Sequence, residues 1–172
     1  MIQGWNLTQI LPVGTSANTF RLPTNCYFCT AAALQSMDCN TLSRERDLMQ
    51  YDTGDFDEFK ELFPYPISHR VFTQVSDARQ FLMGNLPKHN AVALSYLRST
   101  GSGHSIVVFR THMSVVETQG PGGPGVAVYD NGGSLRHIDY QKENPQPEDG
   151  LIPENDLIYN SSIVRLGVFW RT

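Results

Sequence analysis

The sequence predicts an α+β fold, because helical patterns dominate its first half and strand patterns its second half. Up to residue 86, helix-forming residues recur in short segments that polar caps and prolines separate. From residue 90 onward, runs of β-branched and aromatic residues alternate with turns rich in Gly and Pro. We therefore expect N-terminal helices packed on a C-terminal, mostly antiparallel β-sheet, with residues 1–172 forming a single domain.

The helical half follows an irregular stretch. Residues 1–24 contain the breakers Pro12, Gly14 and Pro23, which predict loops rather than regular structure. The run TAAALQSM then contains strong helix formers. Acidic residues begin a later helical segment at Asp55, and a serine can cap the last of the predicted helices. The helices are expected over residues 26–37, 43–50, 55–62 and 76–86.

The second half contains apolar runs such as NAVALSYLR and HSIVVFR, which are typical of buried strands. The stretch QGPGGPG predicts the tip of a hairpin, and KENPQPEDGLIPEN, at residues 142–155, predicts a surface loop. The strands are expected over residues 90–98, 104–110, 114–118, 125–130 and 161–171.

Composition narrows the class of protein. Hydrophobic residues make up 40% of the chain and charged residues 17%, which favours a folded core over disorder. The net charge is −4 and no run of Lys and Arg occurs, which argues against nucleic acid or an anionic membrane as a partner. No apolar stretch approaches the ~18 residues that a membrane helix needs.

The expected compartment follows from the N-terminus and the cysteines. The start, MIQGWNLTQILPVGTS, lacks the basic and apolar regions of a signal peptide. Three cysteines are too few, and odd in number, for a secreted disulfide framework. We expect a protein of the cytoplasm, or one delivered into a target cell by a secretion system that is independent of signal peptides.

Two cysteines lie three residues apart in the stretch NCYFC, at the predicted start of a helix. A cysteine at a helix N-terminus faces unpaired backbone N–H groups and the positive end of the helix dipole. Both lower the pKa of the thiol and favour the nucleophilic thiolate. Cys26 fits that position, because the turn-like Pro23–Thr24–Asn25 precedes it. Cys29 lies one turn further on and is expected to be a small buried residue, but it remains the alternative nucleophile.

Two other uses of the cysteine pair agree less well with its surroundings. A C-x-x-C redox motif normally follows a strand of a βαβ unit, and the residues before Cys26 show no such strand. A zinc site needs four ligands, often in two paired sets. Cys39 and a distant histidine could join the pair, but the chain has no second C-x-x-C and no H-x-x-x-H. We therefore expect no metal and no cofactor.

A cysteine nucleophile needs a base. Among the five histidines, His104 has the most favourable context, because it follows Gly-Ser-Gly and opens a predicted strand. Its ring could therefore lie at a sheet end beside the helix of Cys26. His112, at the far end of that strand, and His137, in SLRHIDY, are weaker candidates.

The base needs a group that orients it, and this group should come from an adjacent strand. Asp130 ends the apolar run GVAVYD and is the expected orienting residue, although a residue in such a place usually caps a turn. Asn131 is the alternative, because an amide can also hold an imidazole ring.

The segments NCYFCTAAAL, GHSIVVF and VAVYDNG, in this order, resemble the papain-like fold of cysteine proteases and their relatives. They look most like the papain-fold toxin domains of bacterial polymorphic toxins and secreted effectors. The first segment is also similar to the cysteine boxes of deubiquitinases. The resemblance covers three short segments within residues 24–132. It implies a papain-like fold with Cys26 as nucleophile, His104 as base and Asp130 as the orienting residue.

The resemblance departs from the family at the oxyanion hole. Papain-like enzymes usually carry a Gln or Asn several residues before the cysteine, whose amide donates to the oxyanion. Thr19, Phe20 and Arg21 occupy that region here, and the nearest upstream amide is Asn18. We expect Asn18 to serve, or the hole to use the Cys26 backbone N–H with another donor.

The resemblance implies a thiol-dependent amide hydrolase without a cofactor, either a cysteine peptidase or a protein glutamine deamidase. It further implies a bacterial toxin or effector that acts on a protein of the target cell, with a neutralising immunity protein as a possible partner. The alternative is a non-catalytic protein-binding module on an α+β scaffold, with which apolar strands and scattered histidines are also compatible.

Overall fold

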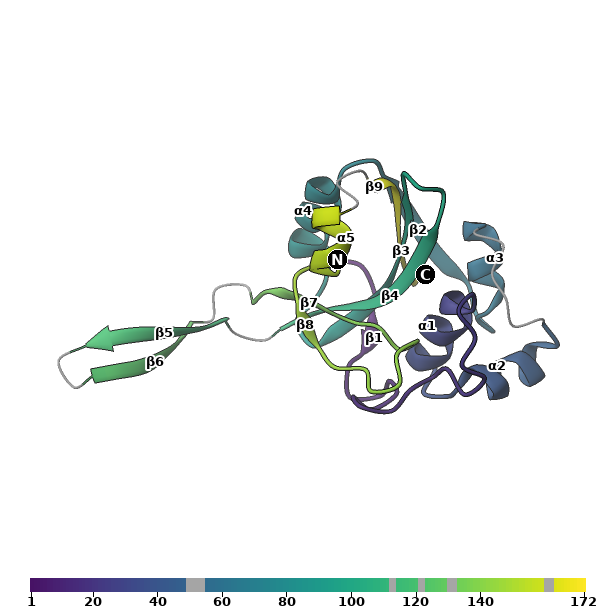
Figure 1. Ribbon diagram of the computed structural model, residues 1–172, viewed down its shortest axis with the longest axis horizontal. Coiled ribbons are helices and arrows are strands. Elements are labelled where there is room, and N and C mark those ends of the chain that lie inside the picture. The colour runs from purple at the N-terminus through teal and green to yellow at the C-terminus, as the bar shows by residue number, and fades with distance from the viewer. Residues whose placement is uncertain (49–54, 112–113, 121–122, 130–132, 160–162) are drawn as a thin grey trace.

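The computed structural model describes residues 1–48, 55–111, 114–120, 123–129, 133–159 and 163–172. The helices within these ranges are α1 (Cys26–Leu34), α2 (Cys39–Arg46), α3 (Phe56–Glu61), α4 (Val75–Asn85) and α5 (Glu154–Tyr159). The strands are β1 (Trp5–Asn6), β2 (Ile67–Phe72), β3 (Asn90–Arg98), β4 (Gly103–Arg110), β5 (Ser114–Gly120), β6 (Gly123–Tyr129), β7 (Leu135–Ile138), β8 (Glu148–Asp149) and β9 (Ile163–Arg171). The predicted α+β class is confirmed (Figure 1).

The main sheet has seven strands and every pairing in it is antiparallel, as predicted. Its order is β2-β9-β3-β4-β7-β8, and β1 pairs with the start of β3. Strand β3 therefore lies centrally, between β9 and β4. Tyr96 of β3 is in register with His104 of β4 and with Leu166 of β9. This row of residues crosses the end of the sheet at which the candidate site lies.

Helices cover the sheet on both faces, which explains why the central strands are apolar along their whole length. Alternate side chains of a strand point to opposite faces, and two core clusters result. Sheet residues in the cluster with α1, α2 and α3 include Ala91, Ala93, Val107, Phe109 and Phe169. Sheet residues in the cluster with α4 include Val92, Leu94, Ile106, Val108, Leu166 and Val168.

Helix α1 is buried along its whole length, from Cys26 to Leu34. It contacts β3 and β4, and the three alanines Ala31, Ala32 and Ala33 are fully buried. Small side chains let a helix backbone approach a sheet closely, whereas larger ones would hold it away. The first turn of α1 is thereby fixed against the end of the central strands.

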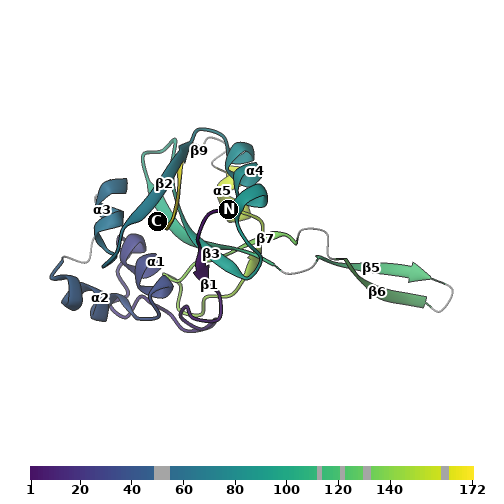
Figure 2. The same ribbon diagram turned by 180° about the vertical axis from the view of Figure 1, so that it is seen from behind.

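Strands β5 and β6 form a separate two-stranded sheet, in which Ser114 pairs with Tyr129 and Gly120 with Gly123. In both views this hairpin extends away from the rest of the chain (Figures 1 and 2). The hairpin expected around QGPGGPG is thus present, although residues 121–122 lie outside the described residues.

Two helix boundaries differ from the prediction for local reasons. The helix expected over 26–37 ends at Leu34, and Ser36 adopts a left-handed backbone with φ of 58°. The helix expected over 43–50 begins at Cys39, because the Asp38 side chain accepts a hydrogen bond from the Thr41 N–H at 2.8 Å and so caps an earlier start.

Other segments adopt a type of structure that differs from the prediction. Strands β2 and β7 were not predicted at all, and β1 lies in the stretch expected to be irregular. The predicted surface loop over 142–155 contains β8 and the start of α5, and its Leu151 and Ile152 are buried in the core beside α4. In the described part of the chain, no helix is both long and apolar enough to cross a membrane.

Candidate active site

Cys26 is the first residue of α1, as the sequence predicted, and it lines a cavity of about 570 Å³. The preceding Asn25 occupies the N-cap position but makes no side-chain capping hydrogen bond. The first-turn N–H groups of α1 are therefore not capped by this side chain. Cys26 is 8% exposed, so it is largely buried even though it lines the cavity.

His104 lies at the start of β4 and lines the same cavity as Cys26. Its ring makes an edge-to-face contact with that of Tyr96, the residue opposite on β3, at 5.9 Å between centroids. The structure thus brings together the predicted nucleophile and the predicted base, which are far apart in the chain, around one cavity. The glycine before His104 opens the strand, so His104 stands at the end of the sheet, at the cavity that the first residue of α1 also lines.

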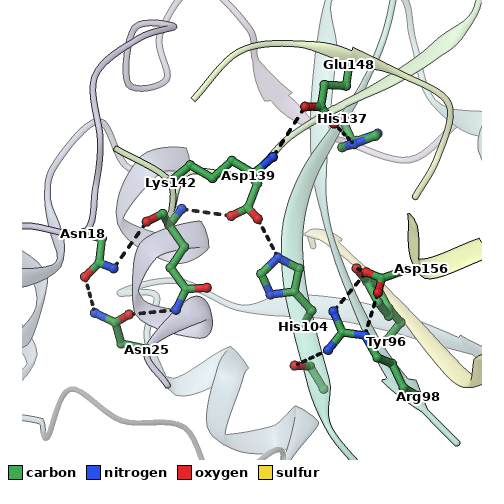
Figure 3. A network of polar contacts seen from close by, with 12 residues as sticks. Asn18, Asn25, Tyr96, Arg98, His104, His137, Asp139, Lys142, Glu148 and Asp156 are labelled. Carbon is green, nitrogen blue, oxygen red and sulfur yellow. Dashed lines mark hydrogen bonds and ion pairs between the residues drawn. The ribbon is translucent and has the colours of Figure 1, made fainter. Parts of the chain in front are cut away.

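The carboxylate that contacts His104 belongs to Asp139, which sequence reasoning did not single out (Figure 3). The His104 Nε2 atom lies 2.7 Å from Asp139 Oδ2. Asp139 follows β7 directly, and β7 pairs with β4, so the sheet itself places the acid next to the histidine. Burial raises the pKa of the Asp139 carboxyl, but the hydrogen bond and charge of His104 outweigh burial and hold the pKa below its usual value.

Asp130 and Asn131, the orienting residues expected from sequence, and His112 lie outside the described residues. The signal that pointed to Asp130 was an acid that closes an apolar strand. The same signal occurs in LRHID, where Asp139 follows β7, but this run is only four residues long. Its place beside β4 depends on the return of the chain after the β5–β6 hairpin, which the sequence pattern does not reveal.

A network of side-chain amides joins the loop of Asp139 to the start of α1 (Figure 3). The Gln141 N–H donates to Asp139 Oδ1 at 3.0 Å, and the Gln141 side chain donates to Asn25 Oδ1 at 3.1 Å. The fully buried Asn25 in turn donates to Asn18 Oδ1 at 2.9 Å. Gln141 therefore links Asn25, the residue before Cys26, to Asp139, the partner of His104. These hydrogen bonds fix the start of α1 relative to the His104–Asp139 pair.

Asn18, the expected oxyanion donor, is engaged in this network. Its side-chain N–H groups donate to the backbone oxygens of Leu22 at 3.0 Å and Gln141 at 3.3 Å. It lines a different surface cavity from Cys26. The structure therefore does not bring Asn18 to the cavity that Cys26 and His104 share.

Cys29 and Cys39 are both fully buried and line none of the cavities described above. A hydrogen bond from Cys29 lowers the pKa of the Cys39 thiol to about 6, and this effect outweighs the opposing effect of burial. Hydrogen bonds from Thr19 contribute in the same direction. Cys39 thus combines a lowered thiol pKa with complete burial, whereas Cys26 lines a cavity that a histidine also lines.

His137 and His69 have surroundings that suit a structural role. Both ring nitrogens of the buried His137 are engaged, one with the Gly150 carbonyl oxygen at 2.9 Å and one with Glu148 at 3.2 Å. His69 packs between aromatic rings, stacked on Phe169, and burial lowers its pKa. Among the described residues, no group of three or more His, Cys, Asp and Glu is arranged to hold a metal ion.

A second polar cluster contributes two residues, Tyr96 and Arg98, to the lining of the cavity. Arg98 makes two hydrogen bonds to the Asp156 carboxylate, at 2.8 and 2.9 Å, and the Tyr96 hydroxyl donates to the same carboxylate. Burial and the carboxylate raise the pKa of Tyr96, so its hydroxyl remains protonated. Because Arg98 and Tyr96 both line the cavity, their hydrogen bonds to Asp156 hold two of its lining side chains in place (Figure 3).

A larger cavity, of about 730 Å³, lies elsewhere, and the described residues that line it include neither cysteine nor histidine. Arg79, Arg136 and Asp149 are among its lining residues. Because these described residues do not combine a cysteine nucleophile with a histidine base, the smaller cavity is the better candidate for an active site.

The lowered pKa of Asp139 predicts a loss of stability in acid. Because the pKa in the folded state lies below the unfolded value of about 3.9, the carboxylate contributes fully above that value. The contribution is lost as the pH falls from about 4 through the folded-state pKa. Urea unfolding at pH values near 5 and 3 should therefore show a smaller acid-induced loss for Asp139→Asn than for wild type.

Asp149→Asn is a suitable control for this acid experiment, because the Asp149 side chain is 96% exposed. It should keep the acid dependence of the wild-type protein. If Asp139→Asn lost as much stability in acid as wild type, the ion pair with His104 would not stabilise the fold.

No protein-family model matches the chain, and no curated protein matches it. The assignment of the site therefore rests on the geometry of Cys26, His104 and Asp139.

Proposed function

We propose that the chain is a papain-like cysteine hydrolase that acts on amide bonds of proteins. The observation that carries the proposal is that Cys26 and His104 line one cavity, while His104 contacts a partly buried carboxylate through Nε2. The Nδ1 atom is then the ring nitrogen that can exchange a proton with the substrate and the thiol. A nucleophile, a base and an orienting acid are the three parts that acyl transfer requires.

The fold supports the family proposal through the order of its parts. The nucleophile begins a buried helix, the base opens a strand on which this helix packs, and the acid follows the next strand of the same sheet. This is the order that the sequence resemblance implied, with Asp139 in the role that had been assigned to Asp130. The proposed triad is therefore Cys26, His104 and Asp139.

The proposed reaction has two stages. The Cys26 thiolate attacks the carbonyl carbon of the amide, and protonated His104 gives its proton to the leaving nitrogen as the C–N bond breaks. The products of this stage are a thioester and a free amine or ammonia. His104 then removes a proton from water, which attacks the thioester, and the acid product leaves as the thiol is restored.

The negative charge on the carbonyl oxygen needs hydrogen-bond donors, since loss of one such donor costs about 2.7–4 kcal/mol of barrier. We assign this role to backbone N–H groups of the first turn of α1, because the Asn25 side chain does not cap them. In this proposal the Asn18 amide has a supporting role, through its hydrogen bond with Asn25.

The same chemistry would cleave a peptide bond or deamidate a glutamine side chain. In line with the resemblance, we propose a toxin or effector that acts on a protein of a target cell and is neutralised by an immunity protein. To separate the two reactions, a target-cell extract can be incubated with wild type and with Cys26→Ala. New protein N-termini that depend on Cys26 indicate a peptidase, and Gln-to-Glu changes indicate a deamidase.

Thiol labelling separates an enzyme from a non-catalytic binding module. The folded protein is treated with iodoacetamide near pH 6 and the labelled cysteines are mapped. The proposal predicts rapid labelling of Cys26, with Cys29 and Cys39 protected by complete burial. A binding module should instead show slow reaction of all three thiols, and that result would refute the proposed function.

Substitution of Asp139 should impair the enzyme less than loss of the nucleophile. Cysteine enzymes often carry a thiolate–imidazolium pair before substrate binds, so the orienting acid matters less than it does for serine enzymes. Asp139→Ala should reduce turnover, and Asp139→Asn should restore part of it, because an amide oxygen still accepts a hydrogen bond from His104. Turnover and thermal stability measured for both variants test this role. Unchanged turnover in Asp139→Ala would leave only a Cys–His pair.

A further inference from the structure

Arg165 forms part of the wall of the cavity that contains Cys26 and His104. It lies in β9, in register with Leu97 of β3, which itself is in register with Gly103. By the alternation of strand side chains, Arg165 shares its face with Gly167 and Phe169, the face that α1 and α3 cover. The guanidinium therefore lies on the same side of the sheet as the proposed nucleophile.

Positively charged side chains are in excess over negatively charged ones around the cavity. Among the described residues, its lining contains Arg98, Arg165 and His104 but no Asp or Glu. Two of these groups have a carboxylate of their own outside the lining, because Arg98 is paired with Asp156 and His104 with Asp139. For Arg165, no ion pair or hydrogen bond to another described residue exists. One positive charge at the cavity is thus not balanced within the described part of the chain.

The aromatic ring of Phe56 supports this guanidinium. The Arg165 Cζ atom lies 4.5 Å from the centroid of the Phe56 ring. The ring is itself fixed, since it makes an edge-to-face contact with Phe169 at 5.3 Å. Gly167 provides the space for it, because a Cβ atom there would come within 2.8 Å of the ring. A stacked guanidinium keeps its N–H donors available for a planar anion.

We infer that Arg165 recognises a carboxylate of the substrate, so that the proposed hydrolase acts on an amide near an acidic side chain. This inference rests on the proposed function, because it concerns the substrate of the same cavity. Arg and carboxylate form paired, charge-assisted hydrogen bonds. A carboxylate bound here would neutralise the charge that the protein leaves unbalanced, while the amide lies beside Cys26.

The charge preference can be measured without a known substrate. Iodoacetate and iodoacetamide both alkylate a thiolate with loss of iodide, and they differ in that iodoacetate carries a carboxylate. The rate constants for Cys26 are measured with each reagent, and the label is mapped to separate Cys26 from the other thiols. We expect Arg165→Gln to lower the ratio of the iodoacetate to the iodoacetamide rate constant about 5-fold, as a nearby unit charge in a partly exposed site should.

Arg70→Gln is the matched control. Arg70 also lies over aromatic rings, at 5.3 Å from the Phe72 centroid and 5.2 Å from that of Phe81, but it does not line the cavity. This variant should keep the wild-type ratio, and both variants should keep the wild-type melting temperature. Added salt should lower the ratio for wild type more than for Arg165→Gln.

The outcomes separate the two proposals. If Cys26 reacts rapidly with both reagents and Arg165→Gln leaves the ratio unchanged, the inference about Arg165 is overturned and the proposed function stands. If Cys26 of wild type reacts slowly with both reagents, the proposed function is overturned and the inference with it.

Peptidyl chloromethyl ketones then identify the source of the carboxylate. A series that carries Glu or Gln at each position should show an Arg165-dependent preference for Glu at one position. A preference for Gln, or none, at every position would overturn the assignment to an acidic side chain.

Discussion

Replacement of Cys26 by alanine is expected to abolish product formation, with a loss on the order of 10⁴-fold or more, because no other group can form the thioester. The fold should be retained, since the change removes a single sulfur atom from a residue at the edge of the cavity. The products to follow are the new N-termini or Gln-to-Glu changes that the wild-type protein generates in a target-cell extract. Circular dichroism and thermal unfolding report the fold.

Cys29→Ala is the matched control for the nucleophile. It removes a fully buried thiol from the same helix, and it should keep most activity while it lowers stability by about 1 kcal/mol. It should also raise the pKa of Cys39, because the hydrogen bond from Cys29 is the main cause of its low value. An inactive Cys29→Ala together with an active Cys26→Ala would reverse the assignment of the nucleophile.

Replacement of His104 by alanine is the second change with a large expected effect. The ring is the proposed proton carrier in both stages, so its loss should reduce turnover by at least ~100-fold, the lower end of what general acid–base catalysis contributes. Turnover is measured with the same products as for Cys26. The variant also leaves the partly buried Asp139 without the His104 ring as its partner, so thermal stability should fall as well.

His69 and His89 provide controls for the base. Neither lines the cavity, so alanine at either position should leave turnover close to that of wild type. A variant His104→Ala that folds and retains wild-type turnover would exclude histidine catalysis at this site.

Part of this site was predictable from sequence because its signals are local. The turn Pro23–Thr24–Asn25 and the helix formers after it place Cys26 at a helix start, and the structure begins α1 at that residue. The apolar runs of β3 and β4 are long and continuous, because both faces of the central sheet are buried. His104 was therefore assigned to a strand start correctly.

The parts of the fold and of the site that the sequence did not predict depend on contacts between segments that are far apart in the chain. Strand β2 has a mixed polar sequence, ISHRVF, and is fixed by its pairing with the C-terminal β9. Strand β7 is short, and it pairs with β4 although the β5–β6 hairpin, which forms its own sheet, lies between them in the sequence. The identity of Asp139 as the partner of His104 follows from that topology, which no local pattern reports.

The most direct measurement of the central claim is the alkylation rate of Cys26 by iodoacetamide as a function of pH, for wild type and for His104→Ala. If Cys26 and His104 act together, Cys26 of wild type should react rapidly even near pH 6, where an ordinary thiol is almost fully protonated. His104→Ala should then react at pH 6 only as slowly as an ordinary thiol. A slow Cys26 in wild type, or an equally fast Cys26 in His104→Ala, would contradict the proposed pair.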